Sequence, residues 1–259
     1  MPLYIRLSEY ALETARYELR REPEFHFSSF RLRPQVSFAM NLREACDTEP
    51  LLQGAISEPQ IVVVGPVTLV PLADFQEEDA ARLYDFCFPS ERQRRVFYDP
   101  VPRAGAMLLF ALDEVLCQKL LEAFPDAHFL SAQTALLRHF AAKGATRPGK
   151  RTFVHLHEGK ADIAVFEDER LMLCNSFDVQ ADTDVAYFTL NVARLHGIDV
   201  SDAPFYVAGN GPLREAAITE LRKYAANVAG INPSAEYNRH LVAMTPGVPY
   251  DLMTLLIEN

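Results

Sequence analysis

The stretch that decides the fold reads His155-Leu156-His157-Glu158-Gly159-Lys160-Ala161-Asp162-Ile163. Apolar residues on both sides of it indicate two β-strands, from Arg151 to His157 and from Ala161 to Glu167. The polar residues between them predict a tight turn that contains a glycine. We therefore expect a β-hairpin, which a third strand from Leu171 to Phe177 extends into a meander.

The rest of the second half alternates helix and strand. The pattern predicts helices at Asp182 to His196, Leu213 to Tyr224 and Asp251 to Ile257. It predicts strands between them at Phe205 to Ala208 and Asn227 to Ile231. Gly197 follows the first of these helices in a position that ends many helices, because glycine tolerates the left-handed conformation there.

The first half repeats this order of elements. Three strands are expected at Leu3 to Leu7, Tyr10 to Tyr17 and Glu24 to Leu32, although the second is equally compatible with a helix. Helices are then expected at Gln35 to Cys46, Glu77 to Phe88, Asp113 to Phe124 and Ala132 to Ala142. Strands between them are expected at Ile61 to Val64 and Ala106 to Leu112, and a further short strand precedes the last helix.

A polar break from Gly144 to Arg151 separates the halves, so we place two domains at 1–146 and 147–259. A three-strand meander followed by right-handed crossovers forms a mixed sheet with helices on its faces. The sequence therefore predicts an α/β protein with two mixed sheets, flanking helices and an interdomain cleft. Such a cleft is the usual place for a small ligand.

Composition excludes several classes of protein. The chain has 259 residues, of which 49% are hydrophobic, so it can bury a large core. Its net charge of −10 disfavours nucleic acid as a partner. No apolar run approaches the length that inserts into a membrane, and the amino terminus lacks the pattern of a secretion signal. Four cysteines without a paired spacing are typical of buried thiols in a reducing compartment, so we expect a cytoplasmic protein.

The repeated order of elements resembles the actin, sugar-kinase and Hsp70-type ATPases, whose domains have a ribonuclease H-like, duplicated actin-like architecture. In that superfamily the first hairpin of the second unit usually reads D-x-G-G-G-T-T-D-I. Gly159, Asp162 and Ile163 match this pattern. His155 stands in place of the metal-linked aspartate, and His157 with Glu158 replaces two glycines.

Two other segments carry the resemblance. Val207-Ala208-Gly209-Asn210-Gly211-Pro212 looks like the adenosine loop of the superfamily. The first phosphate loop, usually D-x-G-[ST], would fall on Arg6-Leu7-Ser8-Glu9, where both the aspartate and the glycine are missing. The resemblance thus implies an ATPase fold whose phosphate loops have changed.

Nearly the whole chain also resembles a bacterial family of unknown function whose members have an actin-like ATPase fold. The phrases that carry this closer resemblance are Phe153 to Gly159, Cys174 to Phe177, Ile231 to Arg239 and Pro249 to Leu252. The resemblance implies a fold and no reaction.

The chemistry of the altered loops argues against ATP hydrolysis. Mg²⁺ prefers carboxylate oxygens, so His155 is a poor substitute for aspartate. Glu158 would repel a polyphosphate, and the loss of glycines hinders close approach of phosphate to the backbone. Lys160 could offset part of this charge. We predict no catalytic residues and no cofactor, with binding of ATP and Mg²⁺ kept as an alternative.

His155 and His157 lie two residues apart and so share one face of a strand. With a third ligand they could hold Zn²⁺, but no third ligand is evident from the sequence, and we predict no metal site. We interpret both as hydrogen-bonded histidines of a cleft or core, and Asp162 as a brace of the hairpin. The cleft candidates are Arg6, His155, His157, Glu158, Gly159, Lys160, Asp162, Gly209, Asn210 and Gly211.

Other motifs have structural interpretations. Gly144 to Lys150 fits G-x-x-x-x-G-K but lacks the preceding strand and following helix of a phosphate loop, so we interpret it as a linker. The basic cluster from Arg92 to Arg95 is expected to be a solvated loop or helix end, or a docking site for an acidic partner. Four further histidines, near predicted element ends, are expected to be structural: His128, His139, His196 and His240.

Three hypotheses follow. The leading one is a catalytically inactive, actin-like protein that acts as an interaction platform or assembly factor for another protein. The second is a divergent ATPase or small-molecule kinase. The third is a sensor of a small ligand or anion, in which Arg6, Lys160 and Asn210 converge on the cleft.

Overall fold

The computed structural model describes residues 2–18, 23–54, 56–144, 148–209 and 211–258. The chain forms two compact units, of which the first contains residues 1–66, 75–99 and 108–134. The second contains residues 67–74, 100–107 and 135–259. The domain boundary predicted at residues 146 and 147 lies outside the described residues.

The first unit is built on a five-stranded mixed sheet with the order β3-β2-β1-β4-β8. Its strands are β1 (Tyr4–Leu7), β2 (Ala11–Glu18), β3 (Glu24–Arg31), β4 (Gln60–Val63) and β8 (His128–Ser131). Strand β1 pairs antiparallel with β2 and parallel with β4, so it lies inside the sheet. The helices of this unit are α1 (Phe38–Thr48), α2 (Ala80–Cys87) and α3 (Glu114–Ala123). Asp113 caps α3, accepting hydrogen bonds from the amides of Val115 and Leu116.

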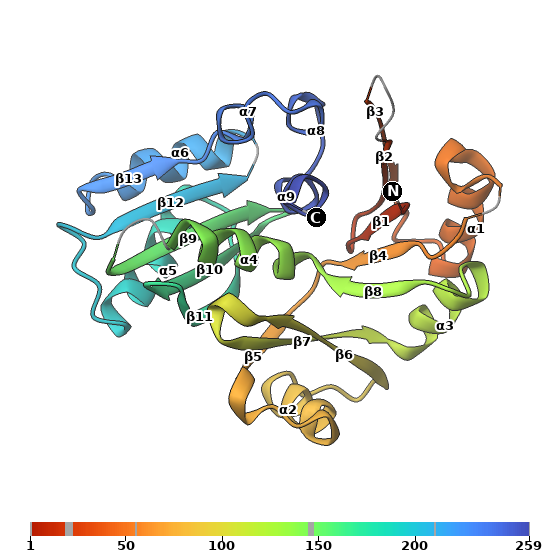
Figure 1. The fold of residues 1–259 in the computed structure, drawn as a ribbon, viewed down its shortest axis with the longest axis horizontal. Helices are drawn as coiled ribbons and strands as arrows, with labels where there is room; N and C mark the ends of the chain where they lie inside the picture. Colours follow the sequence, from red (N-terminus) through yellow and green to blue (C-terminus); the bar gives the residue numbers. More distant parts are fainter. Residues whose placement is uncertain (1, 19–22, 55, 145–147, 210, 259) are drawn as a thin grey trace. The chain divides into compact units, whose positions relative to one another are not determined.

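The second unit repeats the same topology, with the strand order β11-β10-β9-β12-β13 (Figure 1). These strands are β9 (Lys150–His157), β10 (Lys160–Glu167), β11 (Arg170–Asp178), β12 (Pro204–Gly209) and β13 (Asn227–Gly230). Strand β9 pairs antiparallel with β10 and parallel with β12. The helices are α4 (Ala132–Gly144), α5 (Asp182–Leu195), α6 (Pro212–Leu221), α7 (Pro233–Glu236), α8 (Leu241–Met244) and α9 (Tyr250–Glu258).

The two faces of this second sheet have different coverings. Val154 and Leu156 of β9 point into an apolar core shared with residues of α5 and α6. The alternate residues of β9 point to the opposite face, where the ring of Phe153 stacks on Phe140 of α4 with centroids 4.2 Å apart. On that same face, the ring of Tyr250 of α9 lies 6.0 Å from His155. The period of two along β9 therefore places His155 and His157 under α4 and α9.

Two strands that we did not predict join a predicted one in a third sheet with the order β5-β7-β6. They are β5 (Val67–Pro71), β6 (Arg94–Val101) and the predicted β7 (Ala106–Asp113). Both unpredicted strands lie at sheet edges and contain proline, which edges tolerate because no ladder hydrogen bond is lost there.

The structure corrects the prediction made for the basic cluster, because Arg94 and Arg95 belong to strand β6 and not to a loop or helix end. Arg94 pairs with Asp85 at 2.5 Å and Arg95 with Glu114 at 2.5 Å.

A second correction concerns Cys87, which is exposed at the end of α2 and is not a buried thiol. Among the helices of the described residues, none combines the length and apolar character needed to cross a membrane.

Gly209 ends β12 where this strand packs tightly against β9. Its φ of +114° is unfavourable for other residues, and a Cβ atom built there would lie 2.2 Å from the carbonyl oxygen of Leu156. We expect Gly209→Ala to lower the free energy of unfolding by about 2 kcal/mol or more, through backbone strain and overpacking. Urea denaturation of the purified chain measures this loss.

Gly211 provides the matched control. It also has a positive φ, of +91°, but a Cβ atom there would have no heavy atom within 4 Å. Gly211→Ala should cost only the strain, about 1 kcal/mol. Equal losses for the two variants would contradict the close approach of β12 to β9.

Candidate functional site

The candidate site lies on the hairpin of β9 and β10, where the turn consists of two residues. Glu158 and Gly159 both have positive φ, at 45° and 76°, and His157 pairs with Lys160. The prediction of a three-residue turn ending at Lys160 was wrong, since Lys160 is the first residue of β10. The shorter turn changes the register and sets His155 directly opposite Asp162.

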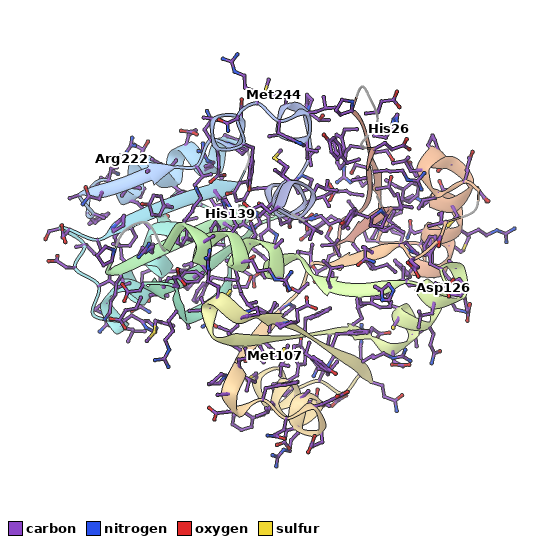
Figure 2. All side chains as sticks on the ribbon, in the orientation of Figure 1. His26, Met107, Asp126, His139, Arg222 and Met244 are labelled. Atoms are coloured by element: carbon purple, nitrogen blue, oxygen red, sulfur yellow. The ribbon has the colours of Figure 1, made fainter. Side chains whose placement is uncertain are left out.

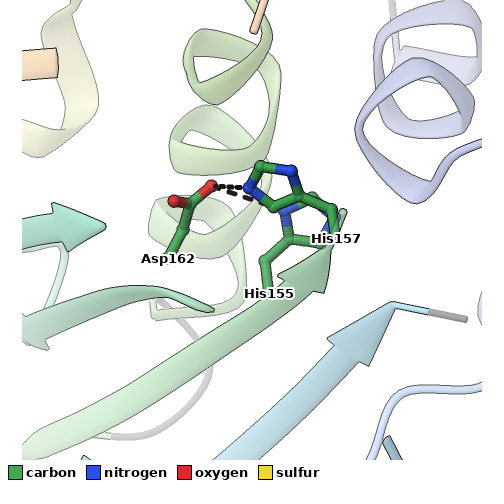
Figure 3. Close-up of side chains that lie close together, drawn as sticks. All are labelled: His155, His157 and Asp162. Carbon is green, nitrogen blue, oxygen red and sulfur yellow. Dashed lines mark hydrogen bonds and ion pairs between the residues drawn. The ribbon is translucent and has the colours of Figure 1, made fainter. Parts of the chain in front are cut away.

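This register brings together two imidazoles and one carboxylate (Figure 3). His157 Nε2 lies 2.8 Å from Asp162 Oδ2, and His155 Nδ1 lies 3.7 Å from the same oxygen. The two imidazole rings stack with centroids 4.9 Å apart. Ser176 of β11 donates a hydrogen bond to the other carboxylate oxygen, Oδ1, at 2.5 Å. Asp162 thus braces the hairpin, as predicted, through contacts to His157 on β9 and to Ser176 on β11.

The carboxylate is buried, with 6% of Asp162 exposed to solvent. Burial alone would raise its pKa, but the neighbouring His157 and His155 hold the pKa of Asp162 well below its ordinary value. The group is therefore a carboxylate at neutral pH and carries its negative charge into the interior. A charge buried in this way needs compensation from its neighbours.

The remaining predicted site residues of this hairpin lie at its tip. Lys160 is half-buried and pairs with Asp178 at 2.6 Å, in an ion pair whose Asp178 side chain is 87% exposed. Glu158, also half-buried, and the exposed Gly159 form the turn itself. The structure therefore separates the hairpin residues of the predicted set into a cluster of His155, His157 and Asp162, and the tip.

Gly209 and Gly211 lie at the carboxyl end of β12, beside a pocket of about 330 Å³. Its lining also includes Arg214, Glu215, Ile231, Asn232 and Pro233. Arg214 donates a hydrogen bond to the carbonyl oxygen of Ile231 at 2.6 Å and forms an ion pair with Glu215. The predicted site residue Asn210 lies outside the described residues.

Arg6 belongs to the first unit, where it is buried in β1 with only 1% of its surface exposed. Its guanidinium donates a hydrogen bond to Glu13 of β2 at 2.7 Å, and the two residues are direct cross-strand partners. This pair occupies the segment in which the resemblance places a phosphate loop.

A second polar cluster in the second unit was not predicted. His139 is buried in the middle of α4, not near a helix end (Figure 2). Its Nε2 lies 3.0 Å from Glu236 of α7, and its Nδ1 forms an ion pair with Glu258 of α9. The hydroxyl of Tyr250 donates to Glu236 at 2.8 Å. The sequence held no local signal for this cluster, because Glu236 lies 97 residues from His139.

Charge explains how this second cluster tolerates burial. Burial alone would lower the pKa of His139, but the hydrogen bonds that its imidazole donates to Glu236 and Glu258 raise it above the ordinary value of 6.5. Burial alone would raise the pKa of Glu236, but hydrogen bonds from His139, Lys143 and Tyr250 lower it to about 2. Each partner therefore favours the charged form of the other.

The meander-plus-crossover topology, present twice, defines an actin-like ATPase fold. A solved structure from Bacteroides thetaiotaomicron, described as a protein with an actin-like ATPase fold and unknown function, matches with a TM-score of 0.84 at 22% identity. The match covers 98% of this chain and 95% of that chain. The PilM-PilN type IV pilus biogenesis complex matches with a TM-score of 0.52 at 15% identity, over 90% of this chain and 89% of the other.

The chain belongs to the family described as "Protein of unknown function (DUF3822)", whose family model matches residues 2–228. A comparison with curated proteins found no match. The predicted fold class, and the predicted membership of a family of unknown function with this fold, are confirmed.

The Arg6–Glu13 pair gives a prediction about stability. We expect Arg6→Met to lower the free energy of unfolding by about 3–5 kcal/mol, because it leaves the Glu13 carboxylate buried beside an apolar side chain. The double variant Arg6→Met with Glu13→Leu should recover most of that loss. A double-mutant cycle by urea denaturation measures the coupling, and additive losses would show that the pair is not a unit.

The His139 cluster gives a prediction about pH. A raised imidazole pKa stabilises the fold below the ordinary value of 6.5, and this contribution is lost as pH rises through the folded pKa. The lowered pKa of Glu236 stabilises the fold above the ordinary value of 4.5, and this contribution is lost as pH falls toward about 2. The cluster should thus contribute most between about pH 4.5 and 6.5.

We expect His139→Gln to lower the free energy of unfolding by about 1–3 kcal/mol at pH 5.5, and by less at pH 9. Urea denaturation at both pH values measures the difference. His26, whose side chain is 53% exposed, supplies the control variant His26→Gln, which should change little. A loss for His139→Gln that is the same at both pH values would contradict the proposed charge pairing.

Proposed function

We propose that this protein does not hydrolyse ATP and acts as an interaction platform or assembly factor for another protein. The observation that carries the proposal is that groups at the sites of both phosphate loops are engaged in contacts within the chain. Arg6 pairs with Glu13, and Asp162 is held by His157 and Ser176. Basic residues, Arg6 and His155, thus stand where a Mg²⁺–polyphosphate complex would need carboxylate oxygens.

The hairpin turn supports the same conclusion. Phosphate is held by backbone amides of glycine-rich turns, which a polyphosphate approaches closely. Here the turn contains one glycine, and Glu158 beside it adds a negative charge. Lys160, the nearest cation in sequence, pairs with Asp178. The residues of this turn therefore do not fit a Mg²⁺-bound polyphosphate, and we derive no phosphoryl-transfer step from them.

The platform role draws its support from the fold. The PilM-PilN structure has the same fold and is named as a type IV pilus biogenesis complex. An actin-like fold can thus serve in an assembly of proteins. This chain carries the same fold over 90% of its length, and we propose a comparable role for it with a partner of its own.

The competing hypothesis is nucleotide or anion binding, and one observation favours it. The pocket beside Gly209 and Gly211 is polar and lies at the carboxyl ends of the parallel strands β12 and β13, an edge at which α/β sheets commonly bind ligands. Against it, the guanidinium of Arg214 is already bonded to Ile231 and paired with Glu215, whose carboxylate opposes an anion.

Thermal unfolding with Mg²⁺ and ATP separates the two hypotheses. A ligand at one hundred times its Kd stabilises a protein by about 2.7 kcal/mol, which for a chain of this size is a shift of about 5 °C or more. We expect no such shift and no phosphate release from the purified chain. A shift that grows with ATP concentration, and that Gly211→Ala reduces, would instead support the nucleotide site.

The platform role needs a separate measurement. The chain, tagged at its own locus and released by gentle lysis, should elute in size-exclusion chromatography within an assembly of fixed stoichiometry. The purified chain alone, run on the same column, is the control for self-association. Elution of the cellular protein as a lone monomer would contradict the platform role.

A further inference from the structure

We propose that the hairpin of β9 and β10 binds one divalent transition-metal ion, of the zinc class, through His155, His157 and Asp162. Each of these residues offers one ligand atom, and the three atoms lie within 4.8 Å of one another. The proposal replaces our prediction of no metal site, for which the missing observation was a third ligand. It is independent of the platform role, because none of the three ligands comes from a partner.

The ligands are held on rigid backbone. Strand β9 carries both histidines and is paired on both edges, with β10 and with β12. Asp162 lies directly opposite His155 on β10, and cross-strand partners of this kind have Cβ atoms about 5 Å apart. A metal site on paired strands is positioned more tightly than one on a loop.

The distances suit a small ion. Zinc binds imidazole nitrogen and carboxylate oxygen at about 2.0–2.2 Å, so neighbouring ligand atoms in a tetrahedral site are about 3.3 Å apart. The two distances to Asp162 Oδ2 lie on either side of this value, at 2.8 Å from His157 Nε2 and 3.7 Å from His155 Nδ1. All three ligand atoms lie within 4.8 Å of one another, so the two imidazoles would have to approach each other by at most about 1.5 Å to complete the geometry.

Ser176 supplies the outer support that metal-binding carboxylates usually have. Its hydroxyl donates to Oδ1 of Asp162, so Oδ2 is the oxygen directed at both imidazoles. Hydrogen bonds of this kind orient the ligand and are typical of metal sites. The carboxylate is thus already turned toward the place where the ion would bind.

A hydrogen bond between His157 and Asp162 is the simpler explanation of the contact between them. It does not explain why the Nδ1 atom of the buried His155 has no hydrogen-bond partner in the described part of the chain. His155 is 3% exposed, and among the described residues its Nδ1 has no hydrogen-bond partner. Its 3.7 Å separation from Asp162 is too long for a hydrogen bond. Buried polar atoms are rarely left unsatisfied, and a metal ion would use the lone pair of this nitrogen.

The donor set indicates the class of ion. Two imidazoles and a carboxylate suit zinc and its transition-metal neighbours, whereas Mg²⁺ and Ca²⁺ prefer oxygen ligands throughout. Three protein ligands leave a fourth position, which zinc usually fills with water. The site would thus differ in ligand type from one that holds Mg²⁺ with a nucleotide.

The test uses the full chain, stripped with a chelator and then titrated with Co²⁺ and Zn²⁺ in the absence of nucleotide. We expect one ion per chain, visible absorption of tetrahedral Co²⁺ that Zn²⁺ abolishes, and a rise in Tm with Zn²⁺ but not with Mg²⁺. Anomalous scattering from a zinc-soaked crystal should place the ion between the three side chains. Failure of the wild-type chain to bind, or binding only together with ATP, would overturn the proposal.

Variants identify the ligands. His157→Gln and Asp162→Asn should weaken binding by about tenfold or more, and Ser176→Ala, which leaves all three ligands in place, by about 10- to 100-fold. His139→Gln is the matched control, because His139 is also buried but directs its two nitrogens at different carboxylates. It should bind one ion with unchanged affinity. Unchanged affinity in folded Asp162→Asn, checked by circular dichroism, would also overturn the proposal.

Discussion

The first strand of each five-stranded sheet is paired on both edges, and this constraint fixes which residues lie opposite its side chains. Strand β1 lies between β2 and β4, and β9 lies between β10 and β12. Arg6 on β1 and His155 on β9 are both buried, so each needs polar groups close to it. In both units a carboxylate lies directly across the ladder on the antiparallel partner: Glu13 opposite Arg6, and Asp162 opposite His155.

The two units therefore share one arrangement of residues across their first two strands. Each has a basic residue on its first strand and a carboxylate on its second. The resemblance places an aspartate of the ATPases at both positions, so a basic residue replaces an acidic one on the first strand of each unit. A metal–polyphosphate complex meets a different electrostatic environment on this chain, while the backbone topology is kept.

The sequence predicted the elements around the site well, because their apolar periods are regular and long. It failed at the turn, where counting Lys160 as a turn residue shifts the register by one. That register would set Asp162 opposite Leu156 and turn its carboxylate to the wrong face, since neighbouring residues of a strand point to opposite faces. With a two-residue turn, the predicted register would have placed Asp162 opposite His155 and so revealed the third side chain of the cluster. The partners of His139 could not have been found in this way, because they are brought to it only by tertiary packing of α7 and α9.

Tyr250 links the two clusters of the second unit. Its ring lies 6.0 Å from that of His155 and 6.4 Å from that of His139, and its hydroxyl bonds to Glu236. A single aromatic side chain thus forms a wall of both clusters. Helix α9, which carries this ring, lies beyond the residues matched by the family model, so that model leaves out one wall of both clusters.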